Sequence, residues 1–267
     1  MRFINLLSII FAVIISASAP HAFAQFNPNI EIKEPQNSLE EKAMQVSQMQ
    51  YPREQVVAQA TNAILSASKI AIENNPTMAA LNKQYPGIID EIIKSSLPII
   101  TKAYEDKLPL LWANNNALYM NNFTENDLDI IITFNQSATG IKYKQLLLNN
   151  IDLTDAIKSA SSGVEEGFGA NAKKESDKAL NNSVNKTNRQ MTQTELVEVF
   201  KFENSNTGSK LGLITEDVKN MVGQWDFYFP DNFQQMVANV QRKAATKFME
   251  EADAKAEAAA SNEDGAE

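Results

Sequence analysis

The stretch that decides the fold reads Phe123-Thr124-Glu125-Asn126-Asp127-Leu128 and continues with Phe134, Ser137, Thr139, Gly140 and Lys142. It recurs without a gap as Met191-Thr192-Gln193-Thr194-Glu195-Leu196, followed by Phe202, Ser205, Thr207, Gly208 and Lys210. Both copies begin with the same helix-starting residues and place a glycine at the same distance from them. The repetition predicts one structural element that the chain uses twice.

Each copy opens with the pattern of a capping box. Thr124 is followed three residues later by Asp127, and Thr192 is followed by Glu195. In this arrangement the hydroxyl accepts from a first-turn N–H, and the carboxylate accepts from the N–H of the capping residue. The apolar residue before each threonine also has the spacing of a hydrophobic staple to the leucine that follows the box.

The apolar residues after each box lie on one helical face. They are Leu128, Ile131 and Phe134 in the first copy, and Leu196, Val199 and Phe202 in the second. Ser137 and Ser205 then offer a new cap. Gly140 and Gly208 either end a helix with positive φ or let the next helix pack closely, and the sequence does not choose between these.

A helix–turn–helix unit used twice, over about residues 123–151 and 191–222, is therefore favoured over a ligand site. No alternation of period two extends over the length of a strand. We predict an all-α, multi-helix bundle.

The first copy resembles a known family. Tyr119, Phe123, Thr124, Asp127, Leu128, Phe134, Ser137, Gly140 and Lys142 are similar to the signature of domain-of-unknown-function family 2059, and the resemblance covers about residues 75–151. The chain departs from the pattern at Asn135 and Glu203, where an aromatic residue often stands, and at Thr187, which takes the position of Tyr119. The resemblance implies a bacterial, exported, helical protein with no established activity, in which the motif residues are structural.

The N-terminus reads as a secretory signal peptide over residues 1–24. Arg2 precedes an apolar run from Phe3 to Ile15, and Ala22-Phe23-Ala24 is an A-x-A cleavage site. The run is short for a membrane span, and no later segment is long enough either. We expect an exported protein, periplasmic or secreted after cleavage near Ala24, without a transmembrane segment in the mature chain.

The composition excludes several kinds of site. The chain has 24 basic and 33 acidic residues, a net charge of −9, no cysteine, and one histidine, His21, which lies within the signal peptide. An acidic surface disfavours nucleic acid. Without thiol or imidazole in the mature chain, the usual zinc sites and the Ser-His-Asp and Cys-His arrangements are excluded. We expect no cofactor, no metal site and no catalytic set.

The remaining chain divides into a flexible leader at 25–37, a helical domain at 38–250 and an acidic tail at 251–267. Ser38 and Glu41 have capping-box spacing. Asn75-Pro76 begins a short helix that Tyr85-Pro86-Gly87 ends.

Two segments of the helical domain stay ambiguous. The apolar run from Ile88 to Leu118 contains Pro98 and Pro109, so it forms either one kinked helix, which we favour, or two shorter ones. The polar stretch at about 161–190 is a linker or an exposed helix.

Weak catalytic patterns have simpler explanations. Ser66 and Lys69 have Ser-x-x-Lys spacing, but the companion motifs are absent. Gly167-Phe168-Gly169 has no strand before it and lacks a third glycine. The adjacent carboxylates Asp90-Glu91 and Glu165-Glu166 diverge on a helix, which favours solvated faces.

Two further features remain open to a binding role. The aromatic cluster of Trp225, Phe227, Tyr228 and Phe229 is either a sugar- or lipid-facing patch or, as we favour, core beside a helix corner. Lys142 and Lys210 either contact an anion of a partner or, more ordinarily, are solvated.

Three functional hypotheses follow. The leading one is a non-catalytic interaction module of the cell envelope, with an envelope protein as partner. The second is a carrier of a lipid or other apolar ligand. The third is a carboxylate-dependent hydrolase. The sequence does not give the partner, the oligomeric state, or whether the two copies pack on each other.

Overall fold

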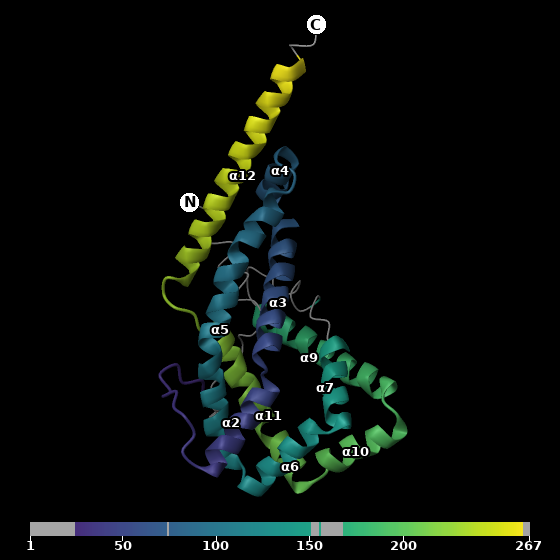
Figure 1. The fold of residues 1–267 in the computed structure, drawn as a ribbon. Coiled ribbons are helices and arrows are strands. Elements are labelled where there is room, and N and C mark those ends of the chain that lie inside the picture. Colours follow the sequence, from purple (N-terminus) through teal and green to yellow (C-terminus); the bar gives the residue numbers. More distant parts are fainter. Residues whose placement is uncertain (1–24, 74, 151–154, 156–167, 264–267) are drawn as a thin grey trace. The chain divides into compact units, whose positions relative to one another are not determined.

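The computed structural model describes residues 25–73, 75–150, 155 and 168–263, and these form helices and no strands. The all-α prediction is confirmed. The predicted signal peptide and Glu165, Glu166 and Gly167 lie outside the described residues. The helices, labelled in Figure 1, are α2 (Ser38–Gln50), α3 (Arg53–Glu73), α4 (Pro76–Gln84), α5 (Ile88–Asn122), α6 (Glu125–Gln136), α7 (Ala138–Asn150), α9 (Phe168–Gln190), α10 (Gln193–Glu203), α11 (Asn206–Phe227) and α12 (Phe233–Glu263).

The chain forms two compact parts. In the described residues, the repeat part comprises 25–57 and 105–228, and the α12 part comprises 58–104 and 229–263. Helix α5 contributes to both parts and runs without a break through Pro98 and Pro109. A single helix, rather than two shorter ones, is therefore confirmed, and the kink stays a prediction.

The α12 part has a core where α4, the start of α5 and α12 meet. Met78, Ile88 and Ile92 are buried there, and Phe248 and Met249 of α12 pack against them. Gly87 joins α4 to α5 with φ of 93°, a conformation that side chains other than glycine rarely adopt. The predicted short helix from Asn75 is confirmed, because the Asn75 side chain accepts from the N–H groups of Thr77 and Met78.

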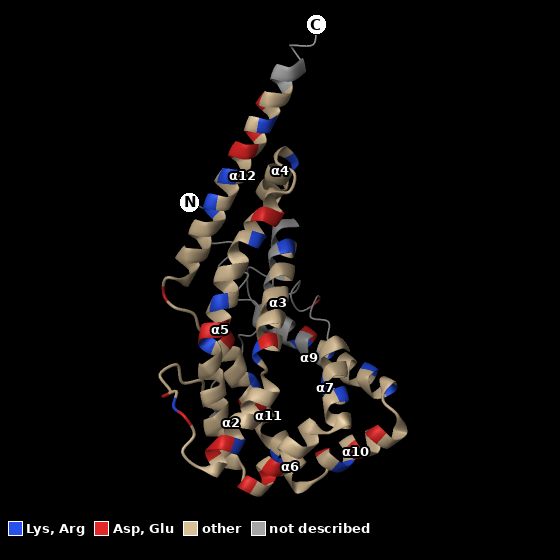
Figure 2. Cartoon of the chain, viewed as in Figure 1, with Lys and Arg blue, Asp and Glu red and all other residues tan. Residues whose placement is uncertain are grey.

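The C-terminal prediction was wrong in part. Helix α12 continues to Glu263, whereas we expected a separate acidic tail from residue 251. Figure 2 shows residues of both charge signs along this helix. Alanine and glutamate have high helix propensity, and this outweighs the polar composition of the segment.

Two predictions near the N-terminus also need correction. Helix α2 is capped by Asn37, one residue before the expected Ser38, and its side chain accepts from Glu40 N–H. The segment at 25–37, which we expected to be a flexible leader, is non-helical, and its start packs within the repeat part. Phe26 is buried against Tyr228, and Asn27 exchanges backbone hydrogen bonds with the Asn114 side chain.

The repeat is longer than the sequence motif indicated. In the repeat part, the end of α5 corresponds to α9, because each precedes two further helices of the repeat: α6 and α7 in the first, α10 and α11 in the second. With an offset of 68 residues, Leu111, Asn115, Tyr119 and Phe123 match Ala179, Ser183, Thr187 and Met191, and all eight are buried. Thr187, where the second copy departs from the family pattern, is therefore buried as Tyr119 is. We call α5 end–α6–α7 the first repeat and α9–α10–α11 the second; the polar stretch predicted as linker or helix is helical from Phe168.

Both capping boxes are present as predicted. Thr124 accepts from Asp127 N–H while the Asp127 carboxylate accepts from Thr124 N–H, and Thr192 and Glu195 do the same. Ser137 and Ser205 each donate to the preceding phenylalanine carbonyl at 2.7 Å and accept from the following glycine N–H at 3.0 Å. The two helix corners thus share the same hydrogen bonds.

The role of the repeated glycines is close approach. Neither Gly140 nor Gly208 has positive φ. A Cβ on Gly140 would lie 2.0 Å from the Phe134 carbonyl oxygen, and one on Gly208 would lie 2.1 Å from that of Phe202. Each corner therefore turns too tightly to admit a side chain.

We predict that Gly140→Ala and Gly208→Ala each destabilise the protein by at least about 2–3 kcal/mol, because the added methyl group meets backbone that cannot move freely. Gly212→Ala is the control: nothing lies within 4 Å of its Cβ position in α11, and alanine there should stabilise by up to about 1 kcal/mol. Urea unfolding followed by circular dichroism measures both effects. Equal losses for Gly140→Ala and Gly212→Ala would contradict the tight corner.

Candidate functional site

The two repeats pack on each other through exchanged ion pairs. Lys210 of the second repeat contacts Asp127, the capping-box residue of the first, at 2.7 Å. Lys142 of the first repeat contacts Glu195, the capping-box residue of the second, at 2.7 Å. Each lysine therefore reaches across to the helix start of the other repeat.

An aromatic pair also joins the two repeats. The rings of Phe134 and Phe202 stack with their centroids 4.0 Å apart and their planes 1° from parallel. Because the two residues occupy the same motif position, the interface is close to two-fold symmetric in its contacts. The two copies of the motif therefore pack on each other, which the sequence alone did not show.

Asp127 is the most enclosed ionisable residue of this interface. Its side chain is 6% exposed and accepts from Thr124 N–H, the Thr124 hydroxyl, the Thr207 hydroxyl and Lys210. Lys210, followed by these other donors, holds the pKa of Asp127 far below its ordinary value. The carboxylate therefore stays ionised although it is buried.

The second pair is similar in pattern and more open. Lys142 bonds both carboxylate oxygens of Glu195, which lowers the pKa of Glu195, and the side chains are 40% and 24% exposed. Thr139 donates to Glu198, one turn along α10 from Glu195, whereas its counterpart Thr207 donates to Asp127.

These contacts correct the expectation for the two lysines. Lys142 and Lys210, which we expected to be solvated or to contact an anion of a partner, are partly exposed and each pairs with a carboxylate of this chain. The remaining motif residues also have structural contacts: Tyr119, Phe123 and Leu128 lie in one buried cluster with Ala43 and Val46 of α2.

A second buried polar arrangement was missed from the sequence. Lys107, in α5, donates to the carbonyls of Trp225 and Asp226 at 3.1 and 2.7 Å, and its ammonium lies 4.4 Å from the Trp225 ring centroid. The Trp225 indole N–H donates back to the Lys107 carbonyl at 2.8 Å. Burial lowers the pKa of Lys107 to about 7, against the opposing effect of Asp226.

The aromatic cluster near residue 225 is divided between the two parts. Trp225 is buried in the repeat part beside Lys107, while Phe229 in the α12 part contacts Tyr104 and stacks on Phe233. Tyr228 is 39% exposed. Trp225 therefore packs as core, as we favoured over a ligand-facing patch, and Phe229 is partly buried.

The residues of the weak catalytic patterns lie on exposed helix surfaces or at a helix start. Ser66 and Lys69 are exposed on α3, and Asp90 and Glu91 are exposed on α5. Gly169 stands within the first turn of α9. Within the residues that the structure describes, no group of three acidic or histidine side chains is arranged to hold a metal ion.

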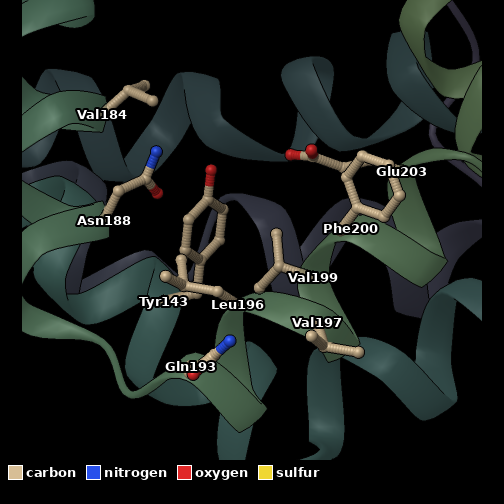
Figure 3. A pocket seen from close by; sticks show the side chains of 9 residues that line it. All are labelled: Tyr143, Val184, Asn188, Gln193, Leu196, Val197, Val199, Phe200 and Glu203. Atoms are coloured by element: carbon tan, nitrogen blue, oxygen red, sulfur yellow. The ribbon is translucent and has the colours of Figure 1, made fainter.

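One hollow in the repeat part lies beside the second repeat. It measures about 390 Å³ and is bounded by α7, α9 and α10, with lining residues Tyr143, Val184, Asn188, Gln193, Leu196, Val197, Val199, Phe200 and Glu203. Figure 3 shows the Tyr143 ring standing between the α9 and α10 side chains. We call it the α10 groove. Its lining is mostly apolar, yet Phe200 is 66% exposed and Val197 45% exposed.

Comparison with known proteins adds no relative: no family model, curated protein or solved structure matches the chain. Across the described helices, none combines the length and the apolar character that a bilayer crossing requires.

We predict that Asp127→Asn destabilises the protein by roughly 2–3 kcal/mol near neutral pH, since Lys210 loses its buried partner. The folded-state pKa of Asp127 lies below its ordinary value of 3.8, so the carboxylate stabilises the fold above that value and loses this contribution as the pH falls further. The gap between wild type and variant should therefore narrow in acid. Urea unfolding over a pH series measures it, and a gap independent of pH would exclude the ion pair as its source.

Lys107 gives a second rise of stability with pH, in a higher pH window. Its pKa falls from 10.5 in the unfolded chain to about 7 in the folded protein, so the unfolded state binds more protons between these values. Stability should rise with pH across this window in wild type, and rise less in Lys107→Met, which has no amine to titrate. Thermal melting at several pH values below about 9.5 tests this, before buried tyrosines titrate. Parallel pH profiles for the two proteins would disprove it.

Proposed function

We propose that this chain is a non-catalytic interaction module of the cell envelope. The observation that carries the proposal is the α10 groove, where Val197 and Phe200 leave apolar surface exposed beside the repeat interface. Contiguous exposed apolar surface rimmed by polar residues is a feature of interaction sites. The polar motif residues, in contrast, are used within the chain to hold the two repeats together.

The proposed location rests on the sequence. Residues 1–24 have the pattern of a secretory signal peptide, and the resemblance of residues 75–151 to domain-of-unknown-function family 2059 implies a bacterial exported protein. Export would place the groove among other envelope proteins, in the periplasm or outside the cell.

A carrier of a lipid or apolar ligand is the second candidate, and the same groove favours it, because about 390 Å³ of mostly apolar space suits a small ligand. Native mass spectrometry of protein purified without detergent would reveal a retained ligand. The hydrolase hypothesis gains less support: the α10 groove contains one lining carboxylate, Glu203, whereas acid–base chemistry of that kind uses two.

We predict that a photo-crosslinking amino acid at position 200 traps one exported protein in living cells. The same amino acid at Leu213, which is 82% exposed on α11 and does not line the groove, is the control. Identification by mass spectrometry should give the same partner repeatedly from position 200 and not from 213. Failure to trap any protein from either position, with the chain correctly exported, would count against an interaction module.

A further inference from the structure

The two repeats differ in what covers them. In the first repeat, Leu128 and Ile131 are fully buried, in a cluster that includes Ala43 and Val46 of α2, with Leu39 and Ile132 packed against it. The offset of 68 residues matches Leu128, Ile131 and Ile132 with Leu196, Val199 and Phe200, which line the α10 groove. The groove is thus the counterpart of the surface that α2 occupies.

The wall from the opposite repeat is equivalent as well. Leu211 of α11 packs against the cluster around α2, and its match at the same offset is Tyr143 of α7, which lines the groove. Each repeat therefore offers a trough made by its own middle helix and the last helix of the other repeat. One trough holds α2, whereas no described segment covers Phe200, 66% of which is exposed in the other.

The direction of an occupant follows from α2. Ser38 donates to Glu125 at 3.0 Å, and Lys42, four residues on, contacts Asp129, four residues further along α6, at 2.8 Å. Equal steps along both helices show that α2 runs in the same direction as α6. A helix in the α10 groove would by symmetry run with α10 and bring its last turn towards Glu203.

The charges of the two troughs differ at both ends. Glu125 and Asp129, which bind Lys42, are replaced by Gln193 and Val197. At the other end, Lys144 donates to the Met49 carbonyl in the last turn of α2, and its match is Gly212. Glu203 lines that end of the groove, and no ion pair joins it to another described residue.

We propose that the α10 groove binds one amphipathic helix of a partner protein, which takes the place that α2 takes on the first repeat, with aliphatic residues spaced i, i+4 and i+7 and a basic last turn beside Glu203. The spacing is that of Leu39, Ala43 and Val46 in α2. The basic turn follows because the negative end of a helix dipole would meet a carboxylate without a lysine to offset it. The inference rests on the proposed function and specifies the partner.

The test uses the full mature chain and two fluorescent peptides. One has the sequence of residues 37–51, and the other carries lysine in place of Gln48 and Gln50 of that sequence. Fluorescence anisotropy should show binding of the lysine peptide, with weaker binding of the unmodified one. Phe200→Asp should weaken binding by about tenfold or more, and Glu203→Lys should reverse the preference between the peptides.

Leu213→Asp is the matched control, since it adds the same charge at an exposed leucine outside the groove and should leave binding unchanged. Phe200 is itself largely exposed, so Phe200→Asp should fold, and its melting temperature checks this. Equal binding to wild type and Phe200→Asp, or no binding of either peptide, would overturn the proposal. Such a failure alongside a protein trapped from position 200 in cells would leave the interaction module standing.

Other occupants give distinct results. A concentration-dependent dimer in sedimentation, abolished by Phe200→Asp and unaffected by the lysine peptide, would assign the groove to a second copy of this chain. Binding to vesicles of zwitterionic phospholipid, abolished by Phe200→Asp, would assign it to lipid. Either result would replace the proposed partner helix.

Discussion

The contact between the buried Asp127 and the partly exposed Lys210 is the one on which the repeat part depends. One carboxylate closes the capping box at the start of α6 and also receives the lysine of the other repeat. A buried charge is costly unless it is fully hydrogen-bonded, and four donors around Asp127 meet this condition. The local start of a helix and the long-range packing of the repeats thus share a single group.

The second repeat has the same kind of ion pair, and its two charged side chains are less buried. Glu195 and Lys142 are more exposed than Asp127 and Lys210. Val199 of α10 is buried, but Phe200 lacks the cover that α2 gives to the matching position of α6. The two halves therefore share corners, caps and crossing contacts, and differ in what lies outside them. The shared contacts stabilise the fold, whereas the surface of α10 that α2 does not cover is open to other molecules.

The sequence predicted what depends on neighbours along the chain. The capping boxes, the Ser137 and Ser205 corners and the helix from Asn75 follow from local spacing, and so does the all-α fold. The role of Gly140 could not be chosen, because a tight corner and a positive φ need the same residue. The partners of Lys142 and Lys210, the burial of Lys107 and the shortage of cover over Phe200 depend on residues distant in sequence, and no pattern at those positions signals them.

The motif and the groove are connected through neighbouring residues. Lys142 precedes Tyr143, and Glu195 precedes Leu196, so each residue of the more exposed ion pair adjoins a residue that lines the α10 groove. Lys142 bonds both carboxylate oxygens of Glu195 and so joins α7 to the first turn of α10, beside two walls of the groove. A preformed groove binds with less loss of conformational entropy than a flexible surface does. The structural role of the motif and a binding role for the groove are for this reason compatible: the first prepares the second.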